Sequence, residues 1–557
     1  MPKKRDYSSW EKMELIKRIE ALEKRKKYGL VWDEESTREE FEEASRGKLP
    51  VLVEEEERAI DAGGEGPTHI MIEGDNYHAL SVLNYTHEGK VDVIYIDPPY
   101  NTGAKDWKYN NNFVDDNDAF RHSKWLSFMN NRLVLAKDLL HKNGVLICTI
   151  DENEHATLGL LLQELFLEYE IVCITIIHNP GGIQGKNFSY CHEYAYFIFP
   201  KNGLFISKKN RDNVPPTPLR DWGKESSKRE AAKNCFYPFI VKENKIIEIG
   251  EVCPDDFHPI KSNLVRKDKS VVIYPIDKKG VERKWRFSRQ SVEAIKDELF
   301  CKEIKGEYVI LRKKQDYRWK TVWDDTKYNA NIYGTQLLNK IIRKEFPYPK
   351  SLYAVMDCIK AIIHDKGGAV ILDFFAGSGT TGHAVMELNK EDGGQRQFIL
   401  CTNNENGIAE EVCYPRVRKV MEGYRSARGQ DVEGLGGKLR YFRTDFVPDE
   451  QTDANKKRIT ERATAMLCLR EGTFEKVEGT EEWQIFKNGE KHTAILYAPE
   501  AILNFRERIE AIEGVVSIYV FSLSNETHAE AFAGLEGRAT LCAVPESILK
   551  VYRRIYG

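Results

Sequence analysis

A short loop, Asp97-Pro98-Pro99-Tyr100, follows an apolar, β-branched run (91–96) that predicts a buried strand. In open α/β sheets ligands bind beyond the carboxyl ends of strands, so this loop is well placed for chemistry. The two prolines fix two φ angles and remove two N–H donors. What remains is a rigid loop rich in acceptors, with the Tyr100 ring available to stack on a base. Such a loop suits a substrate NH2 group, because two acceptors on its hydrogens would localise the nitrogen lone pair.

A second loop, residues 373–380, follows another apolar run and precedes a predicted helix. Gly377 and Gly379 allow the backbone to approach a ligand closely. A third spaced glycine and a Gly-Lys-Ser/Thr step are absent, which excludes a dinucleotide fingerprint and a phosphate-binding ATPase loop. The pattern favours a charged amino-acid ligand, with its ammonium held by Asp373. The candidate residues of this loop are Asp373, Phe374, Phe375, Ala376, Gly377, Ser378, Gly379 and Thr380.

Strands and helices alternate on both sides of these loops, which predicts βαβ units around a parallel sheet. The expected strands are 69–72, 91–96, 145–150, 171–177, 369–372 and 397–402. The expected helices are 77–86, 122–141, 154–167, 352–364 and 381–388. Both loops should therefore lie where a strand of this sheet ends.

Residues 178–330 interrupt this alternation. Between residues 201 and 320 there are 29 Lys and Arg against 18 Asp and Glu, a local charge of +11 in a chain of net charge −4. Aromatic residues are interleaved with the basic ones at 284–287 and 317–320. This composition favours an inserted nucleic-acid-binding domain over an ordinary charged surface.

The two ends of the chain predict additional parts. Residues 8–30 have helical spacing, as an edge helix or as an arm that grips a second subunit, and the acidic stretch 33–60 predicts a solvated linker. The last hundred residues predict a separate small α/β module. We therefore expect an arm and linker (1–67), two core segments (68–200 and 331–445), an insert (201–330) and a C-terminal module (446–557).

Composition narrows the class of protein. The 11 cysteines form no C-x-x-C pair, which argues against a zinc or disulfide framework and fits a reducing cytosol. The basic N-terminus is not followed by an apolar run, and no apolar stretch is long enough to span a bilayer. We expect a cytoplasmic protein without a metal site.

Taken together, the two loops resemble the signature pair of amino-methylating DNA methyltransferases, Asp-Pro-Pro-Tyr and Phe-x-Gly-x-Gly. Their order, with a basic segment between them, resembles the β group of these enzymes. The strings 72–76, 92–103, 122–129 and 545–549 look like the Mod subunits of type III restriction-modification systems. The resemblance implies a Rossmann-like core that binds S-adenosylmethionine, with an inserted target-recognition domain and a small α/β C-terminal module.

The resemblance also implies roles for single residues. Asp97 and Pro98 would bind the target amine and Tyr100 would stack on the adenine, while the 373–380 loop would line the methionine part of the cofactor. Asn403 and Asn404 stand where the family usually has an acidic residue for the ribose hydroxyls, so either an asparagine or Glu405 would serve. The other residues implied to line the cofactor pocket are Asp75 and Asn76 (adenosine), His122, Ser123 and Trp125, and Lys350 (the cofactor carboxylate).

The implied function is site-specific methylation of adenine N6 in double-stranded DNA, on a base flipped out of the duplex. It is a direct displacement aided by alignment, and needs neither a metal nor a strong general base. A homodimer and a helicase-nuclease Res partner are implied as well. The alternatives are methylation of cytosine N4, methylation of RNA or another amine, and a non-catalytic DNA-recognition subunit of a restriction complex.

Overall fold

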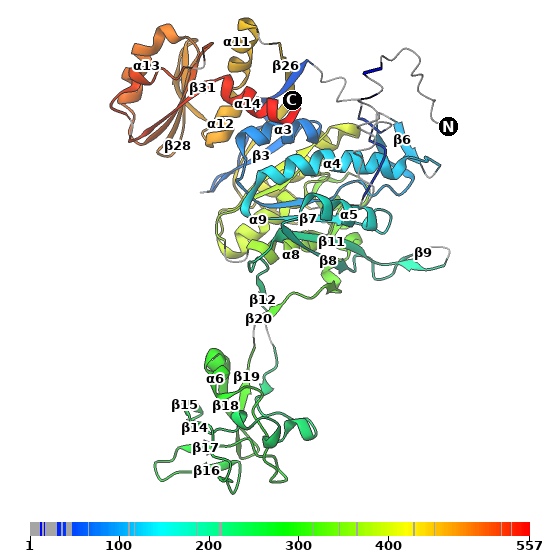
Figure 1. Ribbon diagram of the computed structural model, residues 1–557, viewed down its shortest axis with the longest axis vertical. Helices are drawn as coiled ribbons and strands as arrows, with labels where there is room; N and C mark the ends of the chain where they lie inside the picture. The colour runs from blue at the N-terminus through cyan, green and yellow to red at the C-terminus, as the bar shows by residue number, and fades with distance from the viewer. Residues whose placement is uncertain are drawn as a thin grey trace. The chain divides into compact units, whose positions relative to one another are not determined.

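The computed structural model describes residues 12–13, 16, 30–34, 37–39 and 47–556, except for short gaps at 65, 110–111, 116, 185–186, 211–213, 315, 345, 364–365, 427–428, 451, 525 and 536. Most of the expected N-terminal helix over 8–30 lies outside the described residues; within it, Lys12, Met13 and Ile16 are helical. The chain forms two compact units, one of Met1–Ser207 with Lys320–Gly557 and one of Lys208–Trp319 (Figure 1). In the described part no helix is long and apolar enough to cross a membrane.

The first unit is built on one large sheet, and the expected α/β fold is confirmed. Its strands lie in the order β1-β26-β3-β23-β22-β4-β7-β11-β8-β21, and β26 through β7 are mutually parallel. The central strands are β3 (Thr68–Glu73), β23 (Gln397–Thr402), β22 (Val370–Asp373), β4 (Val91–Ile96) and β7 (Leu140–Ile150). β11 (Glu193–Pro200) runs antiparallel between β7 and β8 (Tyr169–Ile176). β21 (Val322–Trp323) pairs with β8 at the edge.

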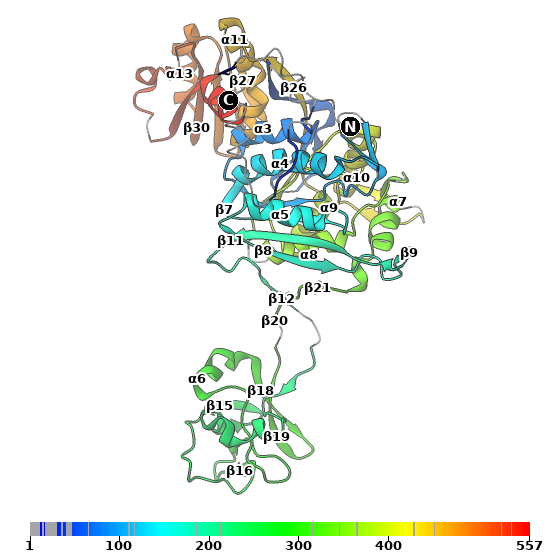
Figure 2. The same ribbon diagram turned by 45° about the vertical axis from the view of Figure 1, so that its right-hand side comes forward.

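Helices cover both faces of this sheet (Figure 2). Crossovers through α3 (Asn76–Thr86), α4 (Arg121–Leu139) and α5 (His155–Leu165) move along the sheet in one direction. Those through α9 (Thr380–Asp392) and α10 (Tyr414–Glu422) move in the other, and α8 (Leu352–Ile363) packs on α9. Because parallel crossovers are right-handed, the two sets lie on opposite faces.

One expectation at the N-terminal side is wrong. Instead of a solvated linker, β1 (Lys48–Glu54) pairs antiparallel with β26 (Lys438–Pro448) at the edge of the sheet. Val51 and Leu52 are fully buried in the main core. The run of four glutamates at 54–57 favoured the prediction of a linker. The short apolar run before it is nevertheless sufficient to form an edge strand.

The C-terminal residues form their own sheet but are not separate from the core. Strands β27 (Glu475–Gly479), β28 (Trp483–Asn488), β29 (Lys491–Leu496), β30 (Val515–Phe521) and β31 (Ala539–Val544) pair in chain order. Leu467 and Ile548 nevertheless share one apolar cluster with Leu80 and Leu83 of α3. The helices α12 (Thr464–Glu471) and α14 (Glu546–Tyr556) both contact α3. The expectation of a separate module is therefore corrected, because burial joins it to the first unit.

The second unit, Lys208–Trp319, has its own core. A four-stranded sheet, β15-β14-β17-β16, and a three-stranded sheet, β13-β19-β18, enclose Tyr237, Phe239 and Trp285. The bounds of these strands are β13 Thr217–Pro218, β14 Phe239–Lys242, β15 Lys245–Ile249, β16 Asn263–Val265, β17 Val271–Ile273, β18 Leu299–Ile304 and β19 Glu307–Arg312. The unit starts seven residues and ends eleven residues inside the expected insert, 201–330.

Candidate active site

The two chemical loops follow neighbouring parallel strands. β22 ends at Asp373 and pairs with β4, which ends one residue before Asp97. From β4 the chain moves along the sheet to β7, and from β22 it moves the opposite way to β23. In open α/β sheets the ligand crevice lies at such a reversal, beyond the carboxyl ends of the two strands. Sequence spacing alone did not show that the loops would be adjacent.

Two side chains from outside the Asp97 loop hold its carboxylate. The hydroxyl of Thr149, on the neighbouring strand β7, donates to Asp97 Oδ1 at 2.7 Å. The ammonium of Lys350, just before α8, lies 3.1 Å from the same oxygen. We expected Lys350 to pair with the carboxylate of a cofactor, and the structure places it against Asp97 instead. Asp97 is therefore fixed in direction and paired with a cation.

The loop's backbone carbonyls are not equivalent. The indole N–H of Trp125, which is fully buried, donates to the Pro99 carbonyl at 2.7 Å. Among the described residues no hydrogen bond reaches the carbonyl of Pro98. Trp125 thus anchors one side of the loop and leaves Pro98 as the available backbone acceptor beside the Asp97 carboxylate.

Glu193 is a site residue that sequence reasoning missed. It begins β11, is 4% exposed, and accepts a hydrogen bond from the Tyr100 hydroxyl at 3.1 Å. The Lys350 ammonium contacts both Glu193 and the Tyr100 hydroxyl, and lies 4.5 Å from the centre of the Tyr100 ring. Burial alone would raise the pKa of Glu193, but Lys350, His178 and the Tyr100 hydrogen bond together outweigh burial and lower it. Burial likewise opposes the charge of Lys350, but Asp97 and Glu193 raise its pKa above the ordinary value.

Asp373 shapes the glycine loop from within. Its carboxylate accepts from the Phe375 N–H at 2.9 Å and from the Thr381 hydroxyl at 2.5 Å. Burial raises the pKa of Asp373 to about 7, and the nearby Asp97 carboxylate adds to that shift. The two loops therefore lie close enough for the Asp97 carboxylate to act electrostatically on Asp373.

The glycine loop presents its backbone to the crevice. Gly377 and Gly379 have φ angles of 48° and 76°, and a Cβ on Gly379 would meet Cys413 Sγ at 3.1 Å. Within the described residues, the N–H groups of Gly377 and Ser378 have no acceptor. These two amides suit an anionic or carbonyl oxygen of an amino-acid ligand.

Several expected side chains of this loop point elsewhere. Phe374 is 1% exposed and belongs to the main core, whereas Phe375 is half-buried and packs against Phe128. The Ser378 and Thr380 hydroxyls accept from the guanidinium of Arg416, at 3.1 and 2.8 Å. Arg416 on α10 is fully buried, and burial lowers its pKa to about 10. Ser378 and Thr380 therefore support the loop from behind, and Ala376 is buried within it.

Asp75 and Asn76 lie at the end of β3, on the glycine-loop side of the crevice. Asp75 caps α3 by accepting from the Tyr77 N–H at 2.8 Å, and its side chain is 38% exposed. The Asn76 amide donates to the Phe374 carbonyl at 2.9 Å. The structure thus joins these two residues to the strand end that carries the glycine loop.

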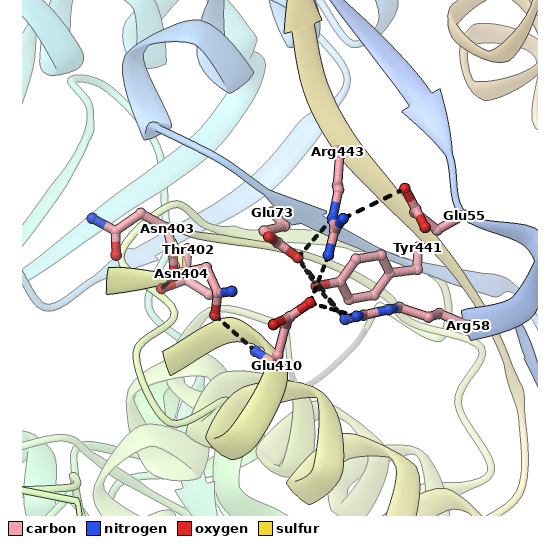
Figure 3. Close-up of polar contacts among 9 residues, drawn as sticks. All are labelled: Glu55, Arg58, Glu73, Thr402, Asn403, Asn404, Glu410, Tyr441 and Arg443. Carbon is pink, nitrogen blue, oxygen red and sulfur yellow. Dashed lines mark hydrogen bonds and ion pairs between the residues drawn. The ribbon is translucent and has the colours of Figure 1, made fainter. Parts of the chain in front are cut away.

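Asn403 and Asn404 follow β23, beside a cluster of ion pairs (Figure 3). The Asn404 side-chain oxygen accepts from the Glu410 N–H at 3.2 Å, and the Asn403 side chain points away from the cluster. The carboxylates of the cluster are engaged: Glu73 pairs with Arg443 at 3.1 Å and Glu410 pairs with Arg443 at 2.6 Å. Asn404 is therefore tied to Glu410, whereas Asn403, which accepts from the Glu405 N–H at 3.3 Å, has the side chain that points away from the cluster.

His122 and Ser123 lie at the start of α4. His122 Nδ1 is 2.7 Å from a carboxylate oxygen of the buried Glu154, which also accepts from the Asn101 amide. Asn101 follows Tyr100 directly, so this contact fastens the end of the Asp97 loop. Ser123 is half-buried next to it.

Comparison with known proteins agrees with this geometry. A family model described as DNA methylase matches residues 91–411, a range that contains both loops. The EcoPI Mod subunit of a type III restriction-modification enzyme from Escherichia phage P1 is 28% identical over 442 residues. That match covers 71% of this chain and 66% of the relative, just under two thirds of its length.

Two further comparisons differ in strength. The type II methyltransferase M.KpnI of Klebsiella pneumoniae is 31% identical over 402 residues, which cover 69% of this chain and 89% of that protein. The crystal structure of the M1.HpyAVI-SAM complex is 13% identical with a TM-score of 0.29, covering 63% of this chain and 97% of that one. The resemblance found from the motifs is confirmed. Because the family model covers more than half of the 557 residues and M.KpnI is matched over most of its length, this chain belongs to the N6/N4 DNA methylase family.

Proposed function

We propose that this chain transfers a methyl group from S-adenosylmethionine to N6 of adenine at a specific site in double-stranded DNA, as the modification subunit of a restriction-modification system. One observation carries the proposal. The acceptor-rich Asp97 loop and the glycine loop end adjacent parallel strands at the point where the sheet changes direction. A base amine and an amino-acid-bearing cofactor can therefore meet in one crevice.

The residues of the Asp97 loop activate and orient the amine. Asp97 and the Pro98 carbonyl accept its two hydrogens, which draws the nitrogen toward tetrahedral geometry and localises its lone pair. Lys350 and Thr149 hold the Asp97 carboxylate in place through an ion pair and a hydrogen bond. When bound, the cofactor supplies an electrophilic methyl group; the chain contributes alignment, and the proton leaves the amine after transfer.

The residues that follow β22, β3 and β23 fit the different parts of the cofactor. Backbone amides of Gly377 and Ser378 suit the carboxylate of the methionine part, and Asp373 suits its ammonium. Asp75 and Asn76 contact the adenosine, and the amides of Asn403 and Asn404 serve the ribose hydroxyls. Phe375, half-buried above the loop, adds apolar contact.

Cofactor affinity should depend on pH through Asp373. Its pKa is raised to about 7, so the carboxyl is neutral at pH 5.5 and becomes charged as the pH rises through 7. A cationic ligand binds the charged form better, and we therefore expect the Kd for S-adenosylmethionine to fall several-fold, roughly tenfold at most, between pH 5.5 and 7.5. Calorimetric titration measures it, and Asp373→Asn should flatten the dependence. Equal affinity at both pH values in the unaltered chain would contradict this role.

The basic unit Lys208–Trp319 contacts the DNA, and the target adenine is flipped out into the crevice. Because phosphate contacts release counterions, we expect DNA affinity to fall at least about tenfold between 50 and 200 mM salt. Fluorescence anisotropy with a labelled duplex gives the slope of log K against log salt. A flat slope would remove the unit from the DNA interface.

A labelled methyl group tests the substrate class. Purified protein is incubated with S-adenosylmethionine carrying a tritiated methyl group, together with DNA, RNA or protein. We expect acid-precipitable label in double-stranded DNA alone. Label in RNA or protein would overturn the proposed substrate, and no label in any of them would favour a non-catalytic DNA-reading subunit.

The same proposal extends to assembly. The EcoPI relative is named as a Mod subunit of a type III enzyme. By that likeness we propose a cytoplasmic homodimer that partners a helicase-nuclease Res subunit. Light scattering of the purified chain should give the mass of a dimer, and a monomer mass would contradict it.

A further inference from the structure

A buried arginine outside both motifs connects several parts of the cofactor pocket. Arg132, on α4, has a side chain that is 1% exposed. Its Nε donates to the Asn76 side-chain oxygen at 2.5 Å, and its Nη2 lies 3.5 Å from the Asp75 carboxylate. The guanidinium also lies 3.8 Å from the centre of the Phe128 ring, which packs against Phe375 of the glycine loop. Arg132 therefore touches the residues proposed to hold the adenosine.

The carboxylate that balances this buried cation comes from the N-terminal segment. Glu39, with a side chain 6% exposed, accepts from Arg132 Nη1 through both oxygens, at 2.9 and 3.1 Å. It also accepts from the Asn131 amide at 3.1 Å. Burial raises the pKa of Glu39, although Arg132 opposes that shift.

Other contacts fasten the same segment along α4. Trp32 donates through its indole N–H to the Ser127 hydroxyl at 3.0 Å, and the Thr37 hydroxyl lies 2.7 Å from the same oxygen. Ser127 and Asn131, four residues apart, share one face of the helix, and Arg132 follows Asn131 directly. We call the described residues 30–34 and 37–39 the N-terminal strap.

We infer that the N-terminal strap contributes Glu39 to the cofactor site, as a positioning residue that acts through Arg132 on Asp75 and Asn76. This inference rests on the proposed function, because it takes these two residues to contact the adenosine. Nothing in the methylase motifs includes the strap, and the family match begins only at residue 91.

The charges explain how the strap would act. Glu39 and Asp75 share one guanidinium, so each limits how strongly the other is drawn to it. If Glu39 loses its charge, Arg132 attracts Asp75 more strongly and turns its half-exposed carboxylate away from a ligand. Asn76 would move with Arg132, because the two are hydrogen bonded, and Asn76 is tied in turn to the Phe374 carbonyl. The expected defect is in cofactor binding, with the methyl-transfer step unchanged.

The test is Glu39→Gln, which keeps the shape and removes the charge. We expect the Kd for S-adenosylmethionine to rise about tenfold, equivalent to about 1.4 kcal/mol. The KM for the cofactor should rise by a similar factor, with kcat at saturating cofactor within about twofold of the unaltered chain. The matched control is Glu34→Gln, the same change at an exposed position of the strap, which should leave both constants unchanged.

Asp75→Asn separates this inference from the proposal beneath it. If Asp75→Asn weakens binding and Glu39→Gln does not, or if Glu39→Gln lowers kcat rather than raising KM, the inference is wrong. If Asp75→Asn has no effect on binding, the proposed adenosine site itself fails. Glu39→Gln should add little in the Asp75→Asn background, because both act through one carboxylate. If Glu39→Gln does not fold, Glu39→Asp is compared with Glu34→Asp instead. A Kd for S-adenosylmethionine that rises in Glu39→Asp alone supports the inference, and equal Kd values in the two variants overturn it.

Discussion

Replacing Asp97 by alanine will lower the rate of methyl transfer about 10³-fold while leaving cofactor binding intact. Asp97 is the acceptor that Thr149 and Lys350 hold in place, and the Pro98 carbonyl alone cannot bind both amine hydrogens. Losing one preorganised polar partner of the reacting group costs about 10²–10³ in kcat, and we expect the upper end of that range. Single-turnover transfer to a methylatable duplex measures the loss.

Two companion measurements define this result. Asp97→Asn keeps one acceptor oxygen and should retain more activity than Asp97→Ala. The Kd for S-adenosylmethionine should change by less than about threefold in both variants, because the glycine loop and β3 hold the cofactor. An alanine variant as active as the unaltered chain would remove Asp97 from the reaction.

Replacing Lys350 by methionine should have the second largest effect. The methionine fills a similar volume but leaves Asp97 and Glu193 close together with no cation between them. Removing one partner of a buried ion pair costs about 3–5 kcal/mol of stability. Without the ammonium, the pKa of Glu193 should rise, so the pH at which kcat reaches half its maximum should move upward, and kcat at neutral pH should fall about 10²-fold.

A second substitution that restores the balance of charge is the control for Lys350→Met. Adding Glu193→Gln to Lys350→Met removes the second carboxylate, and should recover part of the stability and return the pH profile toward that of the unaltered chain. Lys340→Met, the same change at an exposed position of α7 (Gln336–Ile342), should alter neither. A Lys350→Met chain with unchanged stability and pH profile would show that the ammonium does not govern the loop.

The sequence was sufficient to predict those parts of the site whose residues are neighbours along the chain. The Asp97 loop and the glycine loop each combine an apolar strand with a distinctive turn, and such patterns are readable along the chain. The order of helices and strands followed from the same periodicity. The adjacency of β4 and β22 did not, because it depends on how segments almost 280 residues apart pair in the sheet.

The residues that sequence reasoning missed are single polar side chains on otherwise ordinary elements. Glu193 begins an apolar strand, Arg132 and Arg416 lie within amphipathic helices, and Glu39 lies in an acidic stretch. Nothing near them in sequence marks them, because their partners come from distant segments. Their burial reveals them, since a buried charge must be paired or hydrogen bonded. The misplacement of Lys350 has the same cause: its two carboxylate partners lie far upstream.

The identity of the methylated atom tests the central claim most directly. DNA methylated by the unaltered chain with labelled S-adenosylmethionine is digested to nucleosides and separated, beside a reaction with the Asp97→Ala variant. We expect all label in N6-methyladenine from the unaltered chain and none from the variant. Label in N4-methylcytosine, or the same labelled adenine from the variant, would contradict the assignment of the Asp97 loop as the adenine-amine site.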